Sequence, residues 1–268
     1  MSYPVPTELL EAGRGYERLF VPALFAPWTK HLLEAAGVHE GDHVLDIACG
    51  TGVLTRDALS CVGVAGSVVG VDAAPGMIAA AKELEADINW VLGKAEALAL
   101  EDASFDCTMS QFGMMFFEDR EAAVHEMFRV LKPGGKLAIS VWNTIEENPT
   151  YGDIISVLRE HVGVAAAAAD AVHLPFTLGN HGDVTTLLER AGFSDIIVET
   201  KVESARFPSS QSMVEAELRG WLPLFDIHLG EPKIKEVLEQ SDRTLSKYVV
   251  RSGEAVFPTS GHVISARK

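Results

Sequence analysis

The feature that most constrains the fold is a glycine turn that directly follows a short apolar run. Residues 43–52 read HVLDIACGTG, and a helical pattern resumes over 53–62. A buried strand, a glycine turn and a helix in this order place backbone N–H groups and the positive end of the helix dipole beside a ligand. A side chain at Gly50 or Gly52 would obstruct that approach. The sequence therefore predicts a ligand site at the carboxyl end of this strand, as in open parallel sheets.

Strand and helix patterns alternate along residues 40–142, which predicts an α/β fold with a parallel sheet and helices on both faces. Expected strands lie within 43–52, 66–72, 88–98, 105–117 and 136–142. Expected helices cover 53–62, 75–86 and 119–131, and Pro133-Gly134-Gly135 would end the third. Further on, the pattern predicts helices over 183–191, 210–222 and 232–249 and strands over 194–207 and 254–267.

No linker rich in Pro, Gly or Ser divides the 268 residues, so we expect a single domain. Residues 1–42 would form N-terminal lid helices and residues 43–142 the ligand-binding core. Residues 150–182 and 208–250 would add helical cap insertions on the substrate side.

Two acidic residues indicate which ligand the turn would hold. Asp72 lies 22 residues after Gly50 at the end of the next strand, and an acid at this spacing binds ribose hydroxyls. A dinucleotide fingerprint needs a third glycine where this chain has Thr55. Asp46 lies four residues before Gly50, which is unfavourable for a pyrophosphate but suits a ligand with a positive amino-acid end. The pattern therefore favours a ribose-bearing ligand other than a dinucleotide.

The charge and the cysteine content argue against several classes of partner and of site. Lys and Arg total 22 against 38 Asp and Glu, a net charge of −16, which argues against nucleic-acid and anionic-membrane partners. Three cysteines without a C-x-x-C pair argue against a disulfide framework and a zinc site, and we expect no metal centre. No apolar run approaches the roughly 18 residues of a membrane span. We expect a cytoplasmic protein.

Five segments together resemble a known family. They are LDIACGTG, VVGVDAAPGMI, GKAEAL, SFDCTMSQFGMMFF and RVLKPGGKLAISVW, in this order over residues 43–142. In this they resemble class I S-adenosylmethionine-dependent methyltransferases, and within that class the ubiquinone/menaquinone-biosynthesis-like group of small-molecule methyltransferases. The resemblance implies a Rossmann-like, seven-stranded, mostly parallel sheet with the last strand antiparallel. It also implies S-adenosylmethionine as cofactor, S-adenosylhomocysteine as product, and methyl transfer to a small, partly apolar acceptor.

The resemblance also implies roles for individual residues. Asp46 would orient the methionine end, Asp72 would hold the ribose, and Ala95 N–H would reach the adenine edge. An acidic residue is common where this chain has Lys94, so the carboxylate contact to the adenine amino group is either missing or supplied by Glu96. The implied cofactor-binding residues are Tyr16, Asp46, Ala48, Gly50, Thr51, Gly52, Asp72, Ala73, Met77, Ala95, Glu96, Ser110 and Gln111.

On the acceptor side the sequence offers aromatic and histidine side chains. A sulfonium methyl is already electrophilic, so orientation and exclusion of water matter most, and a base is needed only if the acceptor keeps its proton. Phe112 and Met115 leave the fourth expected strand where a substrate must lie, and Trp142 and Trp221 could stack on a flat acceptor. The base candidates are His173 and His181, although a solvated or hydrogen-bonded surface histidine is the preferred interpretation of both.

Two rival functions remain open on the sequence alone. A nicotinamide-dependent oxidoreductase is disfavoured by Thr55, by Asp46 and by the lack of a Tyr-x-x-x-Lys pair near a strand end. A non-catalytic cofactor-binding or regulatory protein on the same fold would keep the same turn and Asp72. The fold also admits other chemistry with the same cofactor.

Overall fold

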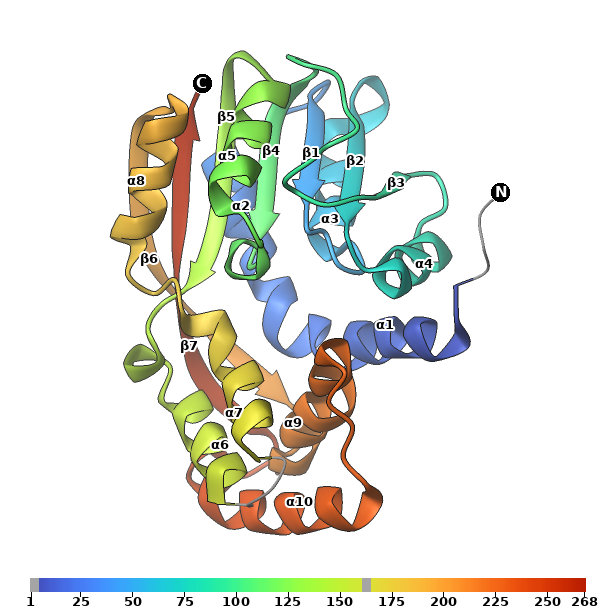
Figure 1. Cartoon of the computed structure of the whole chain (residues 1–268), viewed down its shortest axis with the longest axis vertical. Coiled ribbons are helices and arrows are strands. Elements are labelled where there is room, and N and C mark those ends of the chain that lie inside the picture. The colour runs from blue at the N-terminus through green and yellow to red at the C-terminus, as the bar shows by residue number, and fades with distance from the viewer. Residues whose placement is uncertain (1–4, 161–164) are drawn as a thin grey trace.

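The computed structural model describes residues 5–160 and 165–268, so residues 1–4 of the expected lid and 161–164 of the expected cap lie outside it. Seven strands form one sheet in the order β3-β2-β1-β4-β5-β7-β6 (Figure 1). β7 runs antiparallel to both neighbours, and the other neighbouring pairs are parallel. The strands are β1 (His43–Ile47), β2 (Ser67–Asp72), β3 (Asn89–Leu92), β4 (Phe105–Gln111), β5 (Leu131–Trp142), β6 (Ser194–Phe207) and β7 (Ala255–Arg267). The α/β class and the antiparallel last strand are confirmed.

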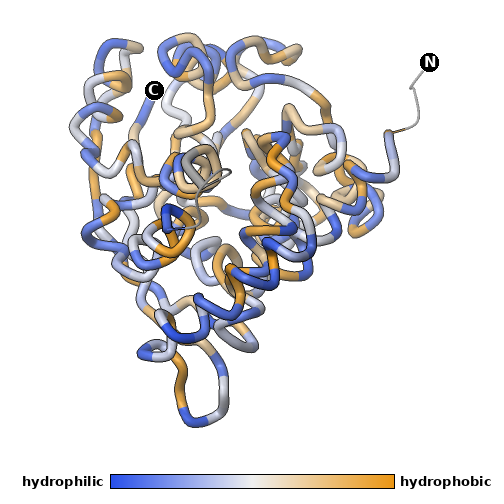
Figure 2. The backbone as a smooth tube through the Cα atoms, turned by 60° about the horizontal axis from the view of Figure 1, so that its bottom comes forward, coloured by the Kyte–Doolittle hydropathy of each residue, from blue (hydrophilic) through white to orange (hydrophobic). Residues whose placement is uncertain are grey.

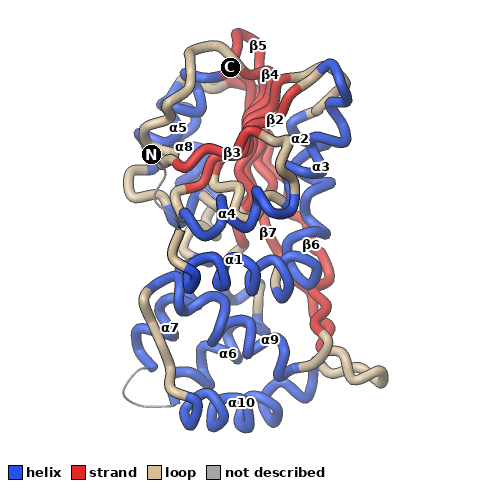
Figure 3. The backbone as a smooth tube through the Cα atoms, turned by 90° about the vertical axis from the view of Figure 1, so that its right-hand side faces the viewer, coloured by secondary structure: helices blue, strands red, loops and turns tan. Residues whose placement is uncertain are grey.

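Helices cover both faces of the sheet, which Figure 3 shows with the sheet edge-on. Successive strand residues point to opposite faces. Val44 therefore packs with Leu32 and Leu54 on one face, while Leu45 and Ile47 belong to the larger core on the other. The covering helices are α2 (Thr29–Ala36) and α3 (Val53–Val62) on the first face, and α5 (Arg120–Val130) and α8 (His181–Ala191) on the second.

β5 begins five residues earlier than its sequence indicates. Leu131 pairs with Phe105, but the next pairing joins Lys136 to Cys107, so the register shifts between them. Gly134 has a φ of +80°, a left-handed conformation that interrupts the regular strand backbone between Leu131 and Lys136. Its N–H donates to the carbonyl oxygen of Lys268. Pro133 to Gly135 thus form an irregularity inside β5 and not the boundary that we expected.

β6 and β7 extend past the rest of the sheet and carry the cap. β5 pairs with β7 only over residues 261–267, whereas β6 pairs with β7 over 255–267. The free extension presents Phe207 and Phe257, whose rings stack in parallel, and Phe257 contacts Tyr151 and Tyr248 of the cap. The cap helices are α6 (Pro149–Glu160), α7 (Ala165–His173), α9 (Ser210–Ala216) and α10 (Glu231–Leu245).

The cap helices are amphipathic, as the alternating colours of the helices brought forward in Figure 2 show. In α10 the buried residues include Ile234, Val237 and Leu245. The helix expected over 210–222 is interrupted. α9 ends at Ala216, and a π-helical turn (Glu217–Trp221) and a 3₁₀ turn (Leu222–Phe225) follow. Pro223 provides no N–H for a regular α-helical continuation.

α1 (Thr7–Leu19) lies across α4 (Pro75–Leu84) between the sheet and the cap (Figures 1 and 3). The crossing is close because two glycines meet there. A Cβ on Gly13 would lie 2.6 Å from the carbonyl oxygen of Gly76. A second π-helical turn, Val21–Phe25, follows α1. α1 and this turn both lie within residues 1–42, for which we expected lid helices.

Among the helices in the described ranges, none is long and apolar enough to cross a membrane.

Candidate active site

The turn after β1 has an unusual backbone that opens a cavity above it. Ala48, Gly50 and Gly52 have φ of +57°, +57° and +88°. The turn after β4 contains a matching feature, since Phe112 has a φ of +52°. The two turns touch, because a Cβ on Gly113 would lie 2.5 Å from that of Ala48. Left-handed backbone at non-glycine residues is uncommon and concentrates at functional sites.

Asp72 fixes the glycine turn to the end of β2. Its Oδ2 accepts a 2.8 Å hydrogen bond from Gly50 N–H, and its Oδ1 accepts one of 2.8 Å from Ala74 N–H. Burial raises the pKa of this carboxyl, although both backbone hydrogen bonds oppose the shift. The carboxylate also lines the cavity, so its remaining lone pairs are available to ligand hydroxyls.

The main cavity has a volume of ≈330 Å³, within the range of small-molecule sites. It brings together residues from the ends of β1, β2, β3 and β4 with Tyr16 of α1. Eleven of the residues that the sequence suggests line it: Tyr16, Ala48, Gly50, Asp72, Ala73, Met77, Ala95, Glu96, Gln111, Phe112 and Trp221.

A small recess of ≈30 Å³ adjoins the main cavity and contains Asp46 and Thr51. Asp46 is fully buried, and its Oδ2 accepts a 2.6 Å hydrogen bond from the Thr55 hydroxyl. Asp46 Oδ1 and Gln111 Oε1 are buried without a partner in the described structure. Burial raises the pKa of Asp46 to about 7, and Asp72 adds to the shift. Two unsatisfied acceptor oxygens, one of them a carboxylate, fit the ammonium group of a cofactor's amino-acid end.

The two glycines of the turn have different roles. A Cβ on Gly50 would have no neighbour nearer than the Tyr16 ring, 3.8 Å away, so Gly50 leaves room on the cavity side. A Cβ on Gly52 would lie 2.2 Å from the Trp90 ring. Packing against Trp90 thus requires Gly52, which lines neither the main cavity nor the recess. The structure thus gives this glycine a packing reason that the sequence did not indicate.

α1 is tied to the turn by a short polar network. Glu17 accepts a hydrogen bond from the Thr51 hydroxyl and forms a 2.8 Å ion pair with Arg56 of α3. Arg56 also donates to the Thr51 carbonyl oxygen. Because all three residues are partly or fully buried, this network holds Tyr16 over the cavity.

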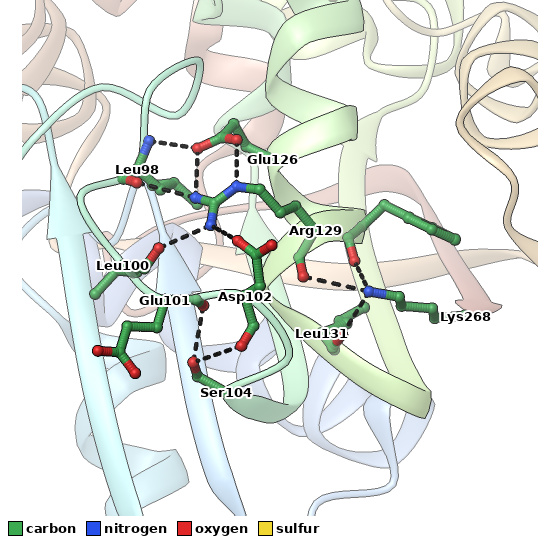
Figure 4. A network of polar contacts seen from close by, with 10 residues as sticks. Leu98, Leu100, Glu101, Asp102, Ser104, Glu126, Arg129, Leu131 and Lys268 are labelled. Carbon is green, nitrogen blue, oxygen red and sulfur yellow. Dashed lines mark hydrogen bonds and ion pairs between the residues drawn. The ribbon is translucent and has the colours of Figure 1, made fainter.

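Figure 4 shows what fixes the loop between β3 and β4, which supplies the side of the cavity near Ala95. Arg129 of α5 is the centre of this network. Its guanidinium donates to the carboxylates of Glu126 and Asp102 and to the carbonyl oxygens of Leu98 and Leu100. Glu126 in turn accepts from Leu98 N–H, and Arg129 holds the pKa of that carboxyl below its usual range. These hydrogen bonds tie the loop to α5 at Leu98, Leu100 and Asp102.

Lys94 and Glu96 occupy this side of the cavity. Lys94 forms a 2.7 Å ion pair with Glu118. Glu96 accepts a 2.8 Å hydrogen bond from Glu118 N–H. Both residues line the main cavity. The Glu96 carboxylate is therefore present on the side of the cavity where an acidic residue is expected in place of Lys94.

A second cavity of ≈50 Å³ lies beside the main one and has aromatic walls. The two cavities share Tyr16, Phe112, Phe116 and Trp221. Phe112 and Trp142 stack with their centroids 3.7 Å apart and their planes 5° apart. Three of the four expected acceptor residues, Phe112, Trp142 and Trp221, thus meet in one place.

Four other residues suggested by the sequence lie away from these cavities. In the 3₁₀ turn Met114–Phe116, Met115 faces the core and Phe116 lines the cavities. Ser110 is buried beneath the turn, with its hydroxyl unpartnered in the described structure. His173 ends α7, and His181 begins α8 with its ring 4.9 Å from that of His262. Neither histidine lines the main cavity, the recess or the second cavity.

Sequence reasoning missed Glu217 and Tyr151, which line the second cavity. One signal could have identified Glu217. It follows Met213 and Val214 at helical spacing and precedes Leu218, so a carboxylate lies on a buried stripe.

Comparisons with known proteins identify the family of this chain. Residues 23–151 match the model of the ubiE/COQ5 methyltransferase family. The ubiquinone/menaquinone biosynthesis C-methyltransferase UbiE of Cronobacter sakazakii is 33% identical over 183 residues, which cover 63% of this chain and 73% of that protein. The protein of the same name from Erwinia tasmaniensis is 38% identical over 171 residues, covering 60% and 68%.

Solved structures show the same fold at low sequence identity. Phosphoethanolamine N-methyltransferase 2 of Haemonchus contortus, in complex with S-adenosyl-L-methionine, superposes with a TM-score of 0.59 at 21% identity, covering 97% of this chain and 57% of that one. The YcgJ protein of Bacillus subtilis superposes with a TM-score of 0.57 at 17% identity, covering 90% and 97%.

Proposed function

Because the chain belongs to the ubiE/COQ5 methyltransferase family, we propose that its acceptor is a hydroxylated aromatic ring, methylated on a ring carbon. The protein is an S-adenosylmethionine-dependent methyltransferase that acts on a small acceptor. The rival oxidoreductase and non-catalytic functions are not favoured by this membership. The relatives named above are C-methyltransferases of ubiquinone and menaquinone biosynthesis, which motivates the choice of ring and acceptor atom.

The cofactor would occupy the main cavity and the recess. Asp46 and Gln111 would accept hydrogen bonds from its ammonium group, and Asp72 would accept hydrogen bonds from its ribose hydroxyls. Ala73, Met77 and Ala95 would surround the adenine, with Glu96 near the adenine amino group. Tyr16 and the network of Glu17, Thr51 and Arg56 would close the site above it. When bound, the cofactor supplies an electrophilic methyl group.

The observation that carries the choice of acceptor is the pair of adjoining cavities. A ring against the stacked Phe112 and Trp142 would lie next to the methyl end of the cofactor cavity, because the cavities share Phe112 and Phe116. Aromatic walls suit a flat acceptor and exclude water, and these are the main requirements of methyl transfer from a sulfonium.

The second cavity must widen before a ring can enter, since its ≈50 Å³ would hold about one or two waters. Phe116 is the side chain placed to move. It separates the two cavities, is 38% exposed and contacts Trp221 with ring centroids 5.4 Å apart. Rotation of Phe116 toward solvent would join the two cavities.

Two measurements test this function in sequence. Thermal unfolding is recorded with S-adenosylhomocysteine, with S-adenosylmethionine and with NAD. A ligand at 100 times its Kd adds about 2.7 kcal/mol, which raises Tm by roughly 5–10 °C. We expect a rise with both adenosyl-sulfur ligands and none with NAD.

Methyl-labelled cofactor is then incubated with hydroquinones, their di-O-methyl ethers and anilines. We expect label in a carbon-bound methyl group of the hydroquinone products only. Label on nitrogen, or turnover of the ethers at the rate of the hydroquinones, would refute the proposed acceptor.

A further inference from the structure

Glu217 is a buried acid without a partner, in the wall of the second cavity. The residue is 4% exposed and begins the π-helical turn Glu217–Trp221. Within the described residues no hydrogen bond or ion pair involves its carboxylate. π-Helical turns frequently occur at functional sites. The other π-helical turn contributes Leu24 and Phe25 to the lining of the same cavity.

Among the described residues, the lining of the second cavity around Glu217 is mostly aromatic and contains no cation. From α6, Tyr151 lines the same cavity, and its hydroxyl is buried without a partner in the described structure. From α1, Tyr16 lines the cavity as well, and the remaining wall residues are apolar. The charged neighbour on the same turn, Arg219, is held at the surface by Glu215 and Glu231.

These groups affect one another's ionisation. Burial alone raises the pKa of Glu217 to about 8. Burial also raises the pKa of Tyr151 and Tyr16 well above their ordinary values, and the Glu217 carboxylate adds to the shift of Tyr151. Near neutral pH the empty cavity therefore holds two neutral phenols and a mostly neutral carboxyl group. All three have unused capacity for hydrogen bonds to a polar group on a bound ring.

We propose that Glu217 is a catalytic residue that accepts the phenolic proton of the acceptor, while the Tyr151 hydroxyl donates a hydrogen bond to the same oxygen. This role rests on the proposed function, because it requires a hydroxylated ring in the second cavity. The geometry supports it: Glu217 and Tyr151 face the same space, which adjoins the cofactor cavity through Tyr16 and Phe116.

The step balances as follows. The ring carbon forms the new bond to the methyl group, and the methyl–sulfur bond breaks with its electron pair on sulfur. The phenolic O–H bond breaks, its electron pair moves toward the ring as a carbonyl forms, and the proton passes to the Glu217 carboxylate. The methylated carbon then loses its own proton to water, and the carbonyl oxygen takes back the proton held by Glu217, which restores both the aromatic ring and the carboxylate. No oxidant or reductant is needed.

The raised pKa suits this role. A free phenol has a pKa near 10, so a carboxylate of pKa about 8 takes its proton far more readily than an exposed glutamate would. Only the ionised carboxylate can accept it, so kcat/KM should rise with pH and level off above about pH 8.

The test compares wild type, Glu217→Gln and Glu217→Asp, with Glu189→Gln as a control in an exposed position on α8. The readouts are Kd for S-adenosylhomocysteine, Kd for a hydroquinone in its presence, and kcat/KM between pH 6 and pH 9. We expect Glu217→Gln to lower kcat/KM about 100-fold or more and to abolish its rise with pH, while S-adenosylhomocysteine binds unchanged. Glu217→Asp should keep part of the activity and the pH dependence, and the control should match wild type.

The two proposals fail in different ways. If wild type methylates hydroquinones and Glu217→Gln keeps kcat/KM within threefold with the same pH profile, the role of Glu217 is refuted and the proposed function stands. If wild type binds S-adenosylhomocysteine but neither binds nor methylates any hydroquinone, the proposed acceptor is refuted and the role of Glu217 with it.

Discussion

Replacing Glu217 with glutamine should stabilise the protein, by an amount that depends on pH. Its pKa rises from 4.5 in the unfolded chain to about 8 in the folded protein, because burial disfavours the charged form. The folded state therefore binds the proton more tightly than the unfolded state. The stability associated with that proton is fully present below pH 4.5 and is lost as pH rises toward 8.

The size of this stability loss follows from the two pKa values of Glu217. Each pH unit in this window corresponds to about 1.4 kcal/mol, so the loss reaches about 3 kcal/mol at pH 7. Glutamine does not titrate and escapes this loss. At pH 7 we expect the variant to be about 3 kcal/mol more stable than wild type, which corresponds to roughly 6–12 °C in Tm.

The assay is urea unfolding of both proteins at pH 5, 6, 7 and 8 without ligand. The amide contributes an offset that does not depend on pH, so the slope of the stability difference is the decisive quantity. We expect equal m-values and a difference that grows by about 1.4 kcal/mol per pH unit. The matched control is Glu189→Gln, in an exposed position on α8. A constant difference between wild type and Glu217→Gln from pH 5 to pH 8 would refute the reasoning.

Two further predictions concern the cofactor site. Asp72→Ala should weaken S-adenosylhomocysteine binding at least tenfold, because charge-assisted ribose contacts and the anchor of Gly50 N–H are both lost. Isothermal titration measures this against Asp57→Ala on the exposed face of α3, and equal affinities for the two variants would contradict it. The pKa of about 7 at Asp46 means that affinity should rise about tenfold from pH 6 to pH 8, as the carboxylate becomes able to bind an ammonium group. In Asp46→Asn binding should be weaker and flat over this range, and a wild-type affinity independent of pH would exclude the assigned role.

Replacing Glu217 with glutamine is thus expected both to increase the stability of the protein and to reduce its activity. Functional groups held in unfavourable surroundings commonly show this opposition. A variant that gained stability and kept full activity would separate the two effects and leave the carboxylate without a function in turnover.

The parts of the fold that follow from local pattern could be predicted. The spacing of Gly50 and Asp72 indicated the ligand site because a strand, a tight turn and a second strand leave few other arrangements. The same holds for β6, whose bounds of 194–207 agree with the sequence pattern. In both cases the constraint lies within a short stretch of chain.

Features set by distant neighbours could not be predicted in this way. Gly52 is required by the Trp90 ring on β3, and no local signal near the turn indicates that contact. Met115 and Phe116 are adjacent apolar residues, and only the 3₁₀ turn decides which of them faces the cavity. The π-helical turn at Glu217 likewise packs against a residue that is distant in the sequence. A Cβ added to Gly220 in this turn would lie 3.2 Å from the Phe20 ring.

The left-handed backbone at Ala48 and Phe112 has a consequence for the way the protein responds to its ligands. Both residues hold a conformation that the unfolded chain seldom visits, and the contact between their two turns keeps them in it, so we expect this floor of the site to be rigid. Amide hydrogen exchange at residues 48–52 and 111–113 should hardly change when S-adenosylhomocysteine binds. Added protection should instead appear in α1 and in the turn Glu217–Trp221, which cover the cavities from the other side. On ligand binding, α1 and the turn Glu217–Trp221 would then move while the turns at 48–52 and 111–113 keep their conformation.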